Sequence, residues 1–224
     1  MKQRFYGLLA LAACFFLMAS TDVKAQADST ATPAFRPQLR IGIQGAMHWN
    51  KVDFSPSVDQ EAFPGNSLAL VFSYISQPAL GIQVELAAET RGWREVIDTF
   101  SGHYERRIRY LSFAPTTLVA LGKGAFQPVI MAGPFVSFPL SNEESIPTPW
   151  VARDHYGAAF TERILYGITG GLGLQLNLNP IAIQATGRYR AGFSSLFRLG
   201  QGGFNFSEPQ AWEARVALLL RIGK

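Results

Sequence analysis

The sequence predicts an all-β fold, an eight-stranded antiparallel up-and-down transmembrane β-barrel. Three observations support this prediction. Apolar and polar residues alternate with a period of two in several segments, as they do in half-buried strands. The connections between these segments are alternately long and short. Composition is the third observation, because 48% of the 224 residues are hydrophobic and only 16% are charged.

This composition argues against several other classes of protein. A charged fraction well below the usual quarter, beside normal apolar content, disfavours a disordered chain and a coiled coil. The mean hydropathy of +0.09 is too low for a polytopic helical membrane protein. The single cysteine, Cys14, rules out a disulfide framework and a zinc knuckle.

Residues 1–27 have the pattern of a secretory signal peptide. Basic residues precede an apolar run over residues 5–19, and small residues offer cleavage sites after Ala25 or Ala27. Cys14 lies inside the apolar run and is interpreted as part of the signal, with lipidation of Cys14 as the alternative. A polar leader, residues 28–37, then precedes the barrel domain at residues 38–224.

Removal of the signal changes the charge balance. Without Lys2, Arg4, Lys24 and Asp22, 17 basic and 15 acidic residues remain, so the formal net charge falls from +4 to +2. The pI near 9.4 is therefore a weak argument for nucleic-acid binding. No basic run with interleaved aromatics occurs, and no nucleic-acid partner is expected.

The strands are predicted from two kinds of segment. Apolar and polar side chains take opposite parities in residues 38–49, 80–91, 181–189 and 210–222. Other segments are rich in strand formers but apolar on both faces or interrupted by glycine, namely residues 67–76, 104–121, 127–140 and 164–178. Together they give about eight strands.

The connections have an asymmetric layout. Three are short, at residues 76–79, 122–125 and 177–180, and four are long, at residues 50–66, 94–102, 141–159 and 194–209. Because long and short connections alternate, all the short ones lie at the same end as both termini. Short periplasmic turns and long outside loops are typical of outer-membrane β-barrels.

A soluble lipocalin-like binding barrel is the alternative, with its apolar face turned inward. The loop asymmetry favours the membrane form. The polar parity also mixes charges with small residues such as Gly42 and Ala46, which suits the narrow interior of an eight-stranded barrel. We therefore expect the apolar parity to contact outer-membrane lipid.

Aromatic residues near the predicted outer strand ends further favour a membrane barrel, because amphipathic rings collect at membrane interfaces. The expected girdle comprises Trp49, Trp93, Tyr104, Phe138, Phe193 and Trp212.

Charged residues of the polar parity are expected to point into the lumen. They must pair there, because an isolated buried charge costs on the order of several kcal/mol. The predicted lumen ion network comprises Arg40, Glu85, Glu89, Arg91, Arg188, Arg190, Glu213, Arg215 and Arg221. A structural network that fills the lumen is the main interpretation, and a conducting or proton-passing pore is the alternative.

The histidines raise the possibility of an enzyme. His48, His103 and His155 map to outer strand ends or an outer loop, and some eight-stranded barrels modify lipid A with a histidine, a serine and an acid. Partners here would be Ser101, Asp98 or Asp154. No nucleophile-elbow sequence occurs, so no catalytic residue is assigned.

The first long loop contains residue types that can ligate a metal. His48, Asp53 and Asp59 could ligate a metal in the first loop, but they lack paired-histidine or Asp-x-Asp spacing. No metal and no cofactor is therefore assigned.

The last long loop is unusually apolar. Its candidate binding or lid residues are Phe197, Leu199, Phe204 and Phe206. Exposed apolar patches of this kind usually have a function. The loop therefore either folds over the barrel mouth as a lid or contacts a partner or lipid.

With its strands placed, the chain resembles the PorT-like outer-membrane β-barrel family of Bacteroidota over residues 37–222. The resembling segments are residues 81–86 with 91–93, 110–115, 127–136, 167–173 and 188–193. The resemblance implies insertion by the outer-membrane assembly machinery and, for some relatives, a role in protein secretion.

The sequence thus predicts a non-enzymatic outer-membrane barrel with a structural or binding role, linked to protein secretion or envelope assembly. A lipid A modifying enzyme and a soluble periplasmic binding barrel are the alternatives. Its expected partners are outer-membrane lipid, the assembly machinery and a secretion or envelope complex.

Overall fold

The computed structural model describes residues 35–96, 103–122, 124–146, 153–158, 163–198, 200 and 203–222. The predicted signal peptide and most of the predicted leader lie outside these residues. Among the residues that the structure describes, no helix is long and apolar enough to span a membrane.

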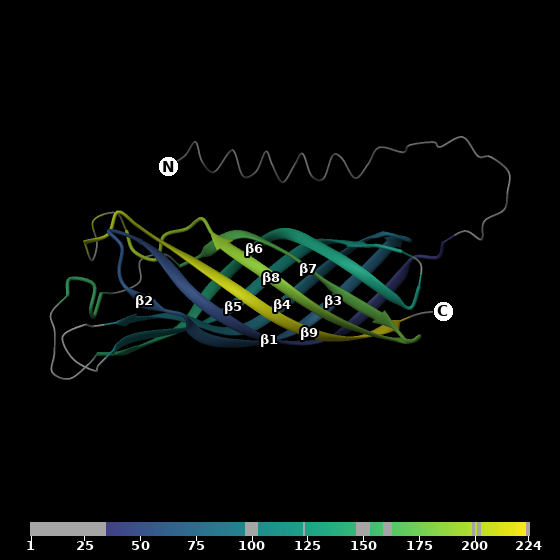
Figure 1. The fold of residues 1–224 in the computed structure, drawn as a ribbon, viewed down its shortest axis with the longest axis horizontal. Helices are drawn as coiled ribbons and strands as arrows, with labels where there is room; N and C mark the ends of the chain where they lie inside the picture. The colour runs from purple at the N-terminus through teal and green to yellow at the C-terminus, as the bar shows by residue number, and fades with distance from the viewer. Residues whose placement is uncertain are drawn as a thin grey trace. The chain divides into compact units, whose positions relative to one another are not determined.

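Within the described residues the chain forms nine antiparallel strands (Figure 1). They are β1 (Gln38–Ser55), β2 (Gln60–Glu61), β3 (Phe63–Gln77), β4 (Leu80–Val96), β5 (His103–Ala120), β6 (Phe126–Ser145), β7 (Leu165–Asn177), β8 (Ile181–Gly192) and β9 (Phe206–Ile222). Each long strand pairs with its neighbour along the chain, and β1 pairs with β9, so eight strands close a ring. Strand β2 adds only a two-residue ladder on β4. The predicted eight-stranded up-and-down barrel is confirmed.

The two ends of the barrel differ in their connections. The links between β3 and β4, β5 and β6, and β7 and β8 span five residues or fewer and lie at the end where β1 begins and β9 stops, here called the turn end. The opposite end is the loop end. Several residues predicted as loop prove to be strand there, because β1, β4 and β6 continue to Ser55, Val96 and Ser145. A membrane-crossing strand needs only about 10 residues, so these strands reach beyond a bilayer.

The apolar parity faces outward, which contradicts a soluble binding barrel. Large apolar side chains such as Ile43, Leu68 and Leu172 are exposed on the outer wall, whereas Gln44, Gln83 and Glu85 are buried inside. Lipid around the barrel stabilises apolar side chains on the outer wall, whereas water around it would favour polar side chains there.

The aromatic girdle is only partly as predicted. Trp49, Phe138, Phe193 and Trp212 are exposed on the outer wall, and Trp49 lies opposite Trp212 in the β1–β9 ladder. Trp93 and Tyr104 were assigned wrongly, because both are fully buried in the lumen. Trp93 shares its parity with Glu89 and Arg91, so strand geometry points its ring inward regardless of residue type.

The lumen is filled in three layers. Near the turn end lie two apolar clusters, one with Leu118 and Met131 and the other with Val71 and Leu219. Near the loop end lies a mainly aromatic cluster, here called the outer plug: Val52, Phe54, Trp93, Tyr104, Ile108, Tyr110, Leu165, Leu196, Phe197 and Phe204. The charged residues lie between these layers.

Candidate functional site

The middle of the lumen holds a charged layer built from β4, β8 and β9. It comprises Glu85, Glu89, Arg91, Arg188, Arg190, Glu213 and Arg215, all buried. Each has the inward parity of its strand, which is why alternation alone places them inside. Arg188 lies opposite Glu213 in the β8–β9 ladder, so opposite charges also meet between neighbouring strands.

Glu85 forms the half of this layer nearer the turn end. Its Oε1 lies 2.6 Å from Nη2 of Arg188, and its Oε2 accepts a hydrogen bond from Nη1 of Arg215. The amides of Gln83 and Gln44 also donate to this carboxylate. A buried carboxylate with two guanidinium and two amide donors has its lone pairs satisfied, which is what burial of a charge requires.

Glu89 and Glu213 form the other half. Glu89 accepts from Nη2 of Arg91 at 2.5 Å and from Nη1 of Arg190 at 3.1 Å. Glu213 lies 2.8 Å from Nε of Arg215 and 3.1 Å from Nε of Arg190. Arg190 and Arg215 therefore link the three carboxylates into one continuous network.

Two residues predicted for this network lie elsewhere. Arg40 and Arg221 are at the turn end, and no described carboxylate lies within 4 Å of either. Including them was wrong, because inward parity does not specify height along the barrel axis. Conversely, His48 belongs to the layer although it was not assigned there, and its parity, shared with Gln44, was the available indication.

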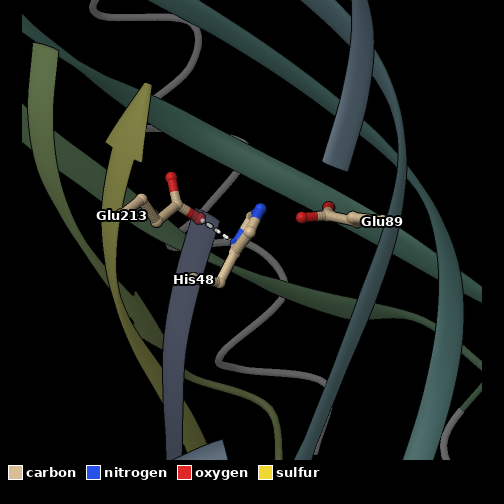
Figure 2. Close-up of side chains that lie close together, drawn as sticks. All are labelled: His48, Glu89 and Glu213. Carbon is tan, nitrogen blue, oxygen red and sulfur yellow. Dashed lines mark ion pairs between the residues drawn. The ribbon is translucent and has the colours of Figure 1, made fainter. Parts of the chain in front are cut away.

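His48 joins the layer through Glu213. Figure 2 shows the imidazole between the carboxylates of Glu213 and Glu89. Its Nδ1 lies 3.2 Å from Oε1 of Glu213, and the three side chains offer ligand atoms within 4.8 Å of one another. This grouping has the donor set of a metal site. However, arginines already occupy both carboxylates, so a cation would have to displace them.

The first-loop metal site weighed from the sequence does not form. His48 is buried in the lumen, whereas Asp53 and Asp59 are exposed. The separation follows from parity, since residues 48 and 53 of one strand face opposite sides.

Ser67 and Glu213 flank the two ring nitrogens of His48. Oγ of Ser67 lies 2.9 Å from Nε2 of His48, whose Nδ1 faces Glu213. Serine, histidine and acid in this order resemble a nucleophile, a base and its orienting carboxylate. The serine and acid weighed from the sequence are different residues: Ser101 and Asp98 lie outside the described residues, and His155 contacts Glu95 instead of Asp154.

The outer plug closes the loop end above the charged layer. Phe197 and Phe204 are buried in it, whereas Phe206 is exposed at the start of β9, and Leu199 lies outside the described residues. Phe204 stacks on Phe54 with ring centroids 4.4 Å apart. These contacts favour the lid over the partner-contact interpretation for Phe197 and Phe204.

The segment 153–158 packs into the same plug. Nε2 of His155 lies 2.7 Å from Oε1 of Glu95, and Tyr156 stacks on Tyr104 at 4.1 Å. Arg106 donates to the carbonyl of Ala158 at 2.6 Å. Two connections that are far apart in sequence therefore close one mouth.

These features define a class, the integral outer-membrane β-barrel with an apolar outer wall and a filled lumen. The sequence model of the outer membrane protein beta-barrel domain family matches residues 25–198. Since this is well over half of the chain, the protein belongs to that family. No curated protein is significantly similar in sequence.

Solved structures of outer-membrane proteins are similar to this chain at low identity. Ail, the attachment invasion locus protein of Yersinia pestis, crystallised with the heparin analogue sucrose octasulfate, is 14% identical, with 83% of this chain and 100% of Ail covered and a TM-score of 0.46. Neisserial surface protein A is 11% identical, with coverage of 82% and 97% and a TM-score of 0.47. The outer membrane enzyme PagL is 12% identical, with coverage of 79% and 97% and a TM-score of 0.41.

Proposed function

We propose that this protein is a non-enzymatic outer-membrane barrel with a sealed lumen and a structural or binding role, serving a secretion or envelope complex in the manner of PorT-like barrels. One observation carries the proposal: apolar, charged and aromatic layers fill the lumen in succession. A barrel filled in this way acts through its surfaces and not through a pore.

One small cavity lies inside the described part of the barrel. A cavity of about 10 Å³ lies between the charged layer and the outer plug, lined among others by Asn50, Arg91, Trp93 and Arg190. That is room for about one water molecule. Arg91, Arg190 and Arg215 each contact two carboxylates, and Arg188 contacts Glu85. Opening a path would therefore break several buried ion pairs together.

Bilayer recordings test the sealed lumen. The folded wild-type protein should give no stable openings, and a Phe197→Ala/Phe204→Ala variant should also stay closed because the charged layer remains. Large uniform openings of the wild-type protein would contradict the proposal. Folding of both proteins is checked by the heat-dependent gel shift of an intact barrel.

The loop end supports a binding role. Strands β4, β5 and β6 continue past the point where β7 begins. Phe138–Ser145 of β6, apart from Leu140 at a register shift, pair with β5 but have no β7 partner in the described ladders. A free strand edge can take up an extended segment of a partner. Crosslinking from Glu143 in intact cells, followed by identification of the captured protein, tests for a secretion or envelope complex.

Export to the outer membrane is part of the proposal. The signal peptide should be cleaved after Ala25 or Ala27, with insertion by the assembly machinery. N-terminal sequencing of the protein from the outer-membrane fraction measures the cleavage site. An N-terminus at a lipidated Cys14 would show the alternative processing.

A lipid A modifying enzyme is a second candidate, favoured only by the chain Ser67–His48–Glu213. Glu213 is paired with arginines, and His48 does not line the small lumen cavity. Mass spectrometry of lipid A from cells with the wild-type protein and with Ser67→Ala distinguishes a non-enzymatic barrel from a lipid A modifying enzyme. We expect identical acylation of lipid A in both, and a difference would establish the enzyme.

A further inference from the structure

The turn end of the barrel is basic and has no acidic residue. Its segments, residues 35–41, 72–83, 117–130, 174–184 and 217–222, contain Arg36, Arg40, Lys123 and Arg221 but no aspartate or glutamate. All described carboxylates therefore lie in the charged layer or toward the loop end. Such one-sided charge focuses the field at this mouth and attracts anions.

Two of these arginines face each other. Arg40 lies directly opposite Arg221 in the β1–β9 ladder, and both have the inward parity of their strands. Like charges in direct opposition destabilise a pair of strands. Leu219, one inward position above Arg221, belongs to the apolar layer that separates this pair from the charged layer.

Arg40 is buried, and no carboxylate of the described residues pairs with it. Its side chain belongs to a residue only 9% exposed, and its Nη2 donates to Oε1 of Gln38 at 2.9 Å. Its Nη1 has no hydrogen-bond partner. A buried guanidinium with an unused donor, beside a second guanidinium and no described carboxylate within 4 Å, is an incomplete site.

We propose that Arg40 and Arg221 bind a phosphate group at the turn-end mouth of the lumen. Phosphate fits because it carries a charge of about −1.5 to −2 near neutral pH, which matches two arginines, and its oxygens accept the parallel N–H donors of guanidinium. Ser73 lies opposite Arg40 in the β1–β3 ladder and is buried, so its hydroxyl adds a donor at the same height. The site is separate from the sealed lumen and does not rest on the proposed function.

The bound phosphate group belongs either to a soluble phosphate compound at this mouth or to the headgroup of a phospholipid. The full folded protein is placed in phosphatidylcholine nanodiscs and titrated with inorganic phosphate, at ionic strength held constant with chloride, while binding is followed calorimetrically. A parallel sample in nanodiscs that also contain phosphatidylglycerol is examined by native mass spectrometry for retained phosphatidylglycerol.

The variants are Arg40→Gln and Arg221→Gln. Arg221 is less buried, so its variant keeps the test valid if Arg40→Gln does not fold. Arg109→Gln is the matched control, because Arg109 is exposed near the loop end and has its own partner, Glu143, at 3.6 Å. The heat-dependent gel shift verifies folding of each.

Binding of inorganic phosphate that weakens about tenfold or more in both variants but not in Arg109→Gln supports a soluble phosphate. Retention of phosphatidylglycerol that both variants lose, without phosphate binding, supports the headgroup. Absence of both effects in the wild-type protein, or equal binding by wild type and variants, overturns the proposal.

Discussion

Glu95 of β4 and His155 of the segment between β6 and β7 form a buried contact of 2.7 Å at the loop end. The same Glu95 oxygen accepts a hydrogen bond from the indole of Trp93 at 2.9 Å. One carboxylate therefore connects the barrel wall, the outer plug and a connection about sixty residues further along the chain. This contact holds segment 153–158 in the mouth.

Replacing Glu95 with alanine should release that segment while the barrel stays folded. Hydrogen bonds to a charged group contribute about 1.5–3 kcal/mol each, so amide deuterium exchange in residues 153–158 should accelerate at least about tenfold. Exchange in the middle of β4 should be unchanged. Glu143→Gln, an exposed carboxylate on β6, is the control. Unchanged exchange in segment 153–158 would show that Glu95 does not hold it.

Alkaline pH should loosen the same mouth. Burial and the neighbouring Glu95 carboxylate raise the pKa of Tyr156 to about 12. An unfolded tyrosine titrates near 10, so the folded state retains this proton where the unfolded state loses it. The stability that Tyr156 contributes is complete below about pH 10 and is lost as the pH rises through about 12.

An absorbance titration of tyrosinate measures this effect. The folded protein should show a tyrosine that ionises near pH 12, and Tyr156→Phe should remove one late-titrating group. Titration of Tyr156 together with exposed tyrosines would contradict the packing against Tyr104 and Glu95. The variant should also reduce the pH dependence of exchange in residues 153–158.

Alternation in the sequence predicted the barrel, and it predicted which side of β1, β4, β8 and β9 faces the lumen. Glu85, Arg188 and Glu213 are inside because two-residue parity leaves no other choice once the apolar face meets lipid. Trp93 shows the opposite case. There the preference of tryptophan for the membrane interface was given more weight than parity, and parity proved decisive.

Pairing across the lumen could not be predicted. Arg188 and Glu85 are 103 residues apart and meet only because strand register and tilt bring them to one height. The same limit explains Arg40 and Arg221, whose parity matches the charged layer while their height does not. The burial of Phe197 and Phe204 likewise depends on how the last long connection folds back, which has no periodicity to indicate it.

Glu85→Gln should destabilise the barrel strongly. The change leaves Arg188 and Arg215 buried without their shared carboxylate. Breaking one side of a buried ion pair costs about 3–5 kcal/mol. Reversible urea unfolding in lipid vesicles measures the loss. Glu143→Gln, which removes an exposed pair with Arg109, should cost less than about 1 kcal/mol. Equal costs for the two variants would mean that the charged layer is hydrated.

Lipids with brominated acyl chains should distinguish tryptophans that contact lipid from tryptophans inside the lumen. Trp212 is 64% exposed on the outer wall, whereas Trp93 is 0% exposed inside the lumen. Bromine quenches an indole only on contact, so fluorescence of a variant that keeps Trp212 alone should be quenched and that of one with Trp93 alone should not. Quenching of Trp93 would contradict its burial in the lumen and would support its place in the aromatic girdle.

Gly171→Ala should destabilise the barrel, because residue 171 lies in the barrel wall against Arg188 of the charged layer. A Cβ at residue 171 would lie 2.2 Å from the carbonyl oxygen of Gly187 and 2.6 Å from Cγ of Arg188. The backbone oxygen cannot move without shifting the β7–β8 ladder, and overpacking of this kind costs about 1–3 kcal/mol. Gly45 is the matched control, because a Cβ there meets nothing within 4 Å.

In urea unfolding in lipid vesicles, Gly171→Ala should therefore have a lower free energy of unfolding than the wild-type protein. Gly45→Ala should be as stable as wild type or more stable by about 0.4–1 kcal/mol, since alanine restricts the unfolded chain. Combining Gly171→Ala with Glu85→Gln gives a further check. Because both changes act on Arg188, their costs should add to less than the sum of the single variants. Full additivity would show that Gly171 acts through the ladder alone and not through the position of Arg188.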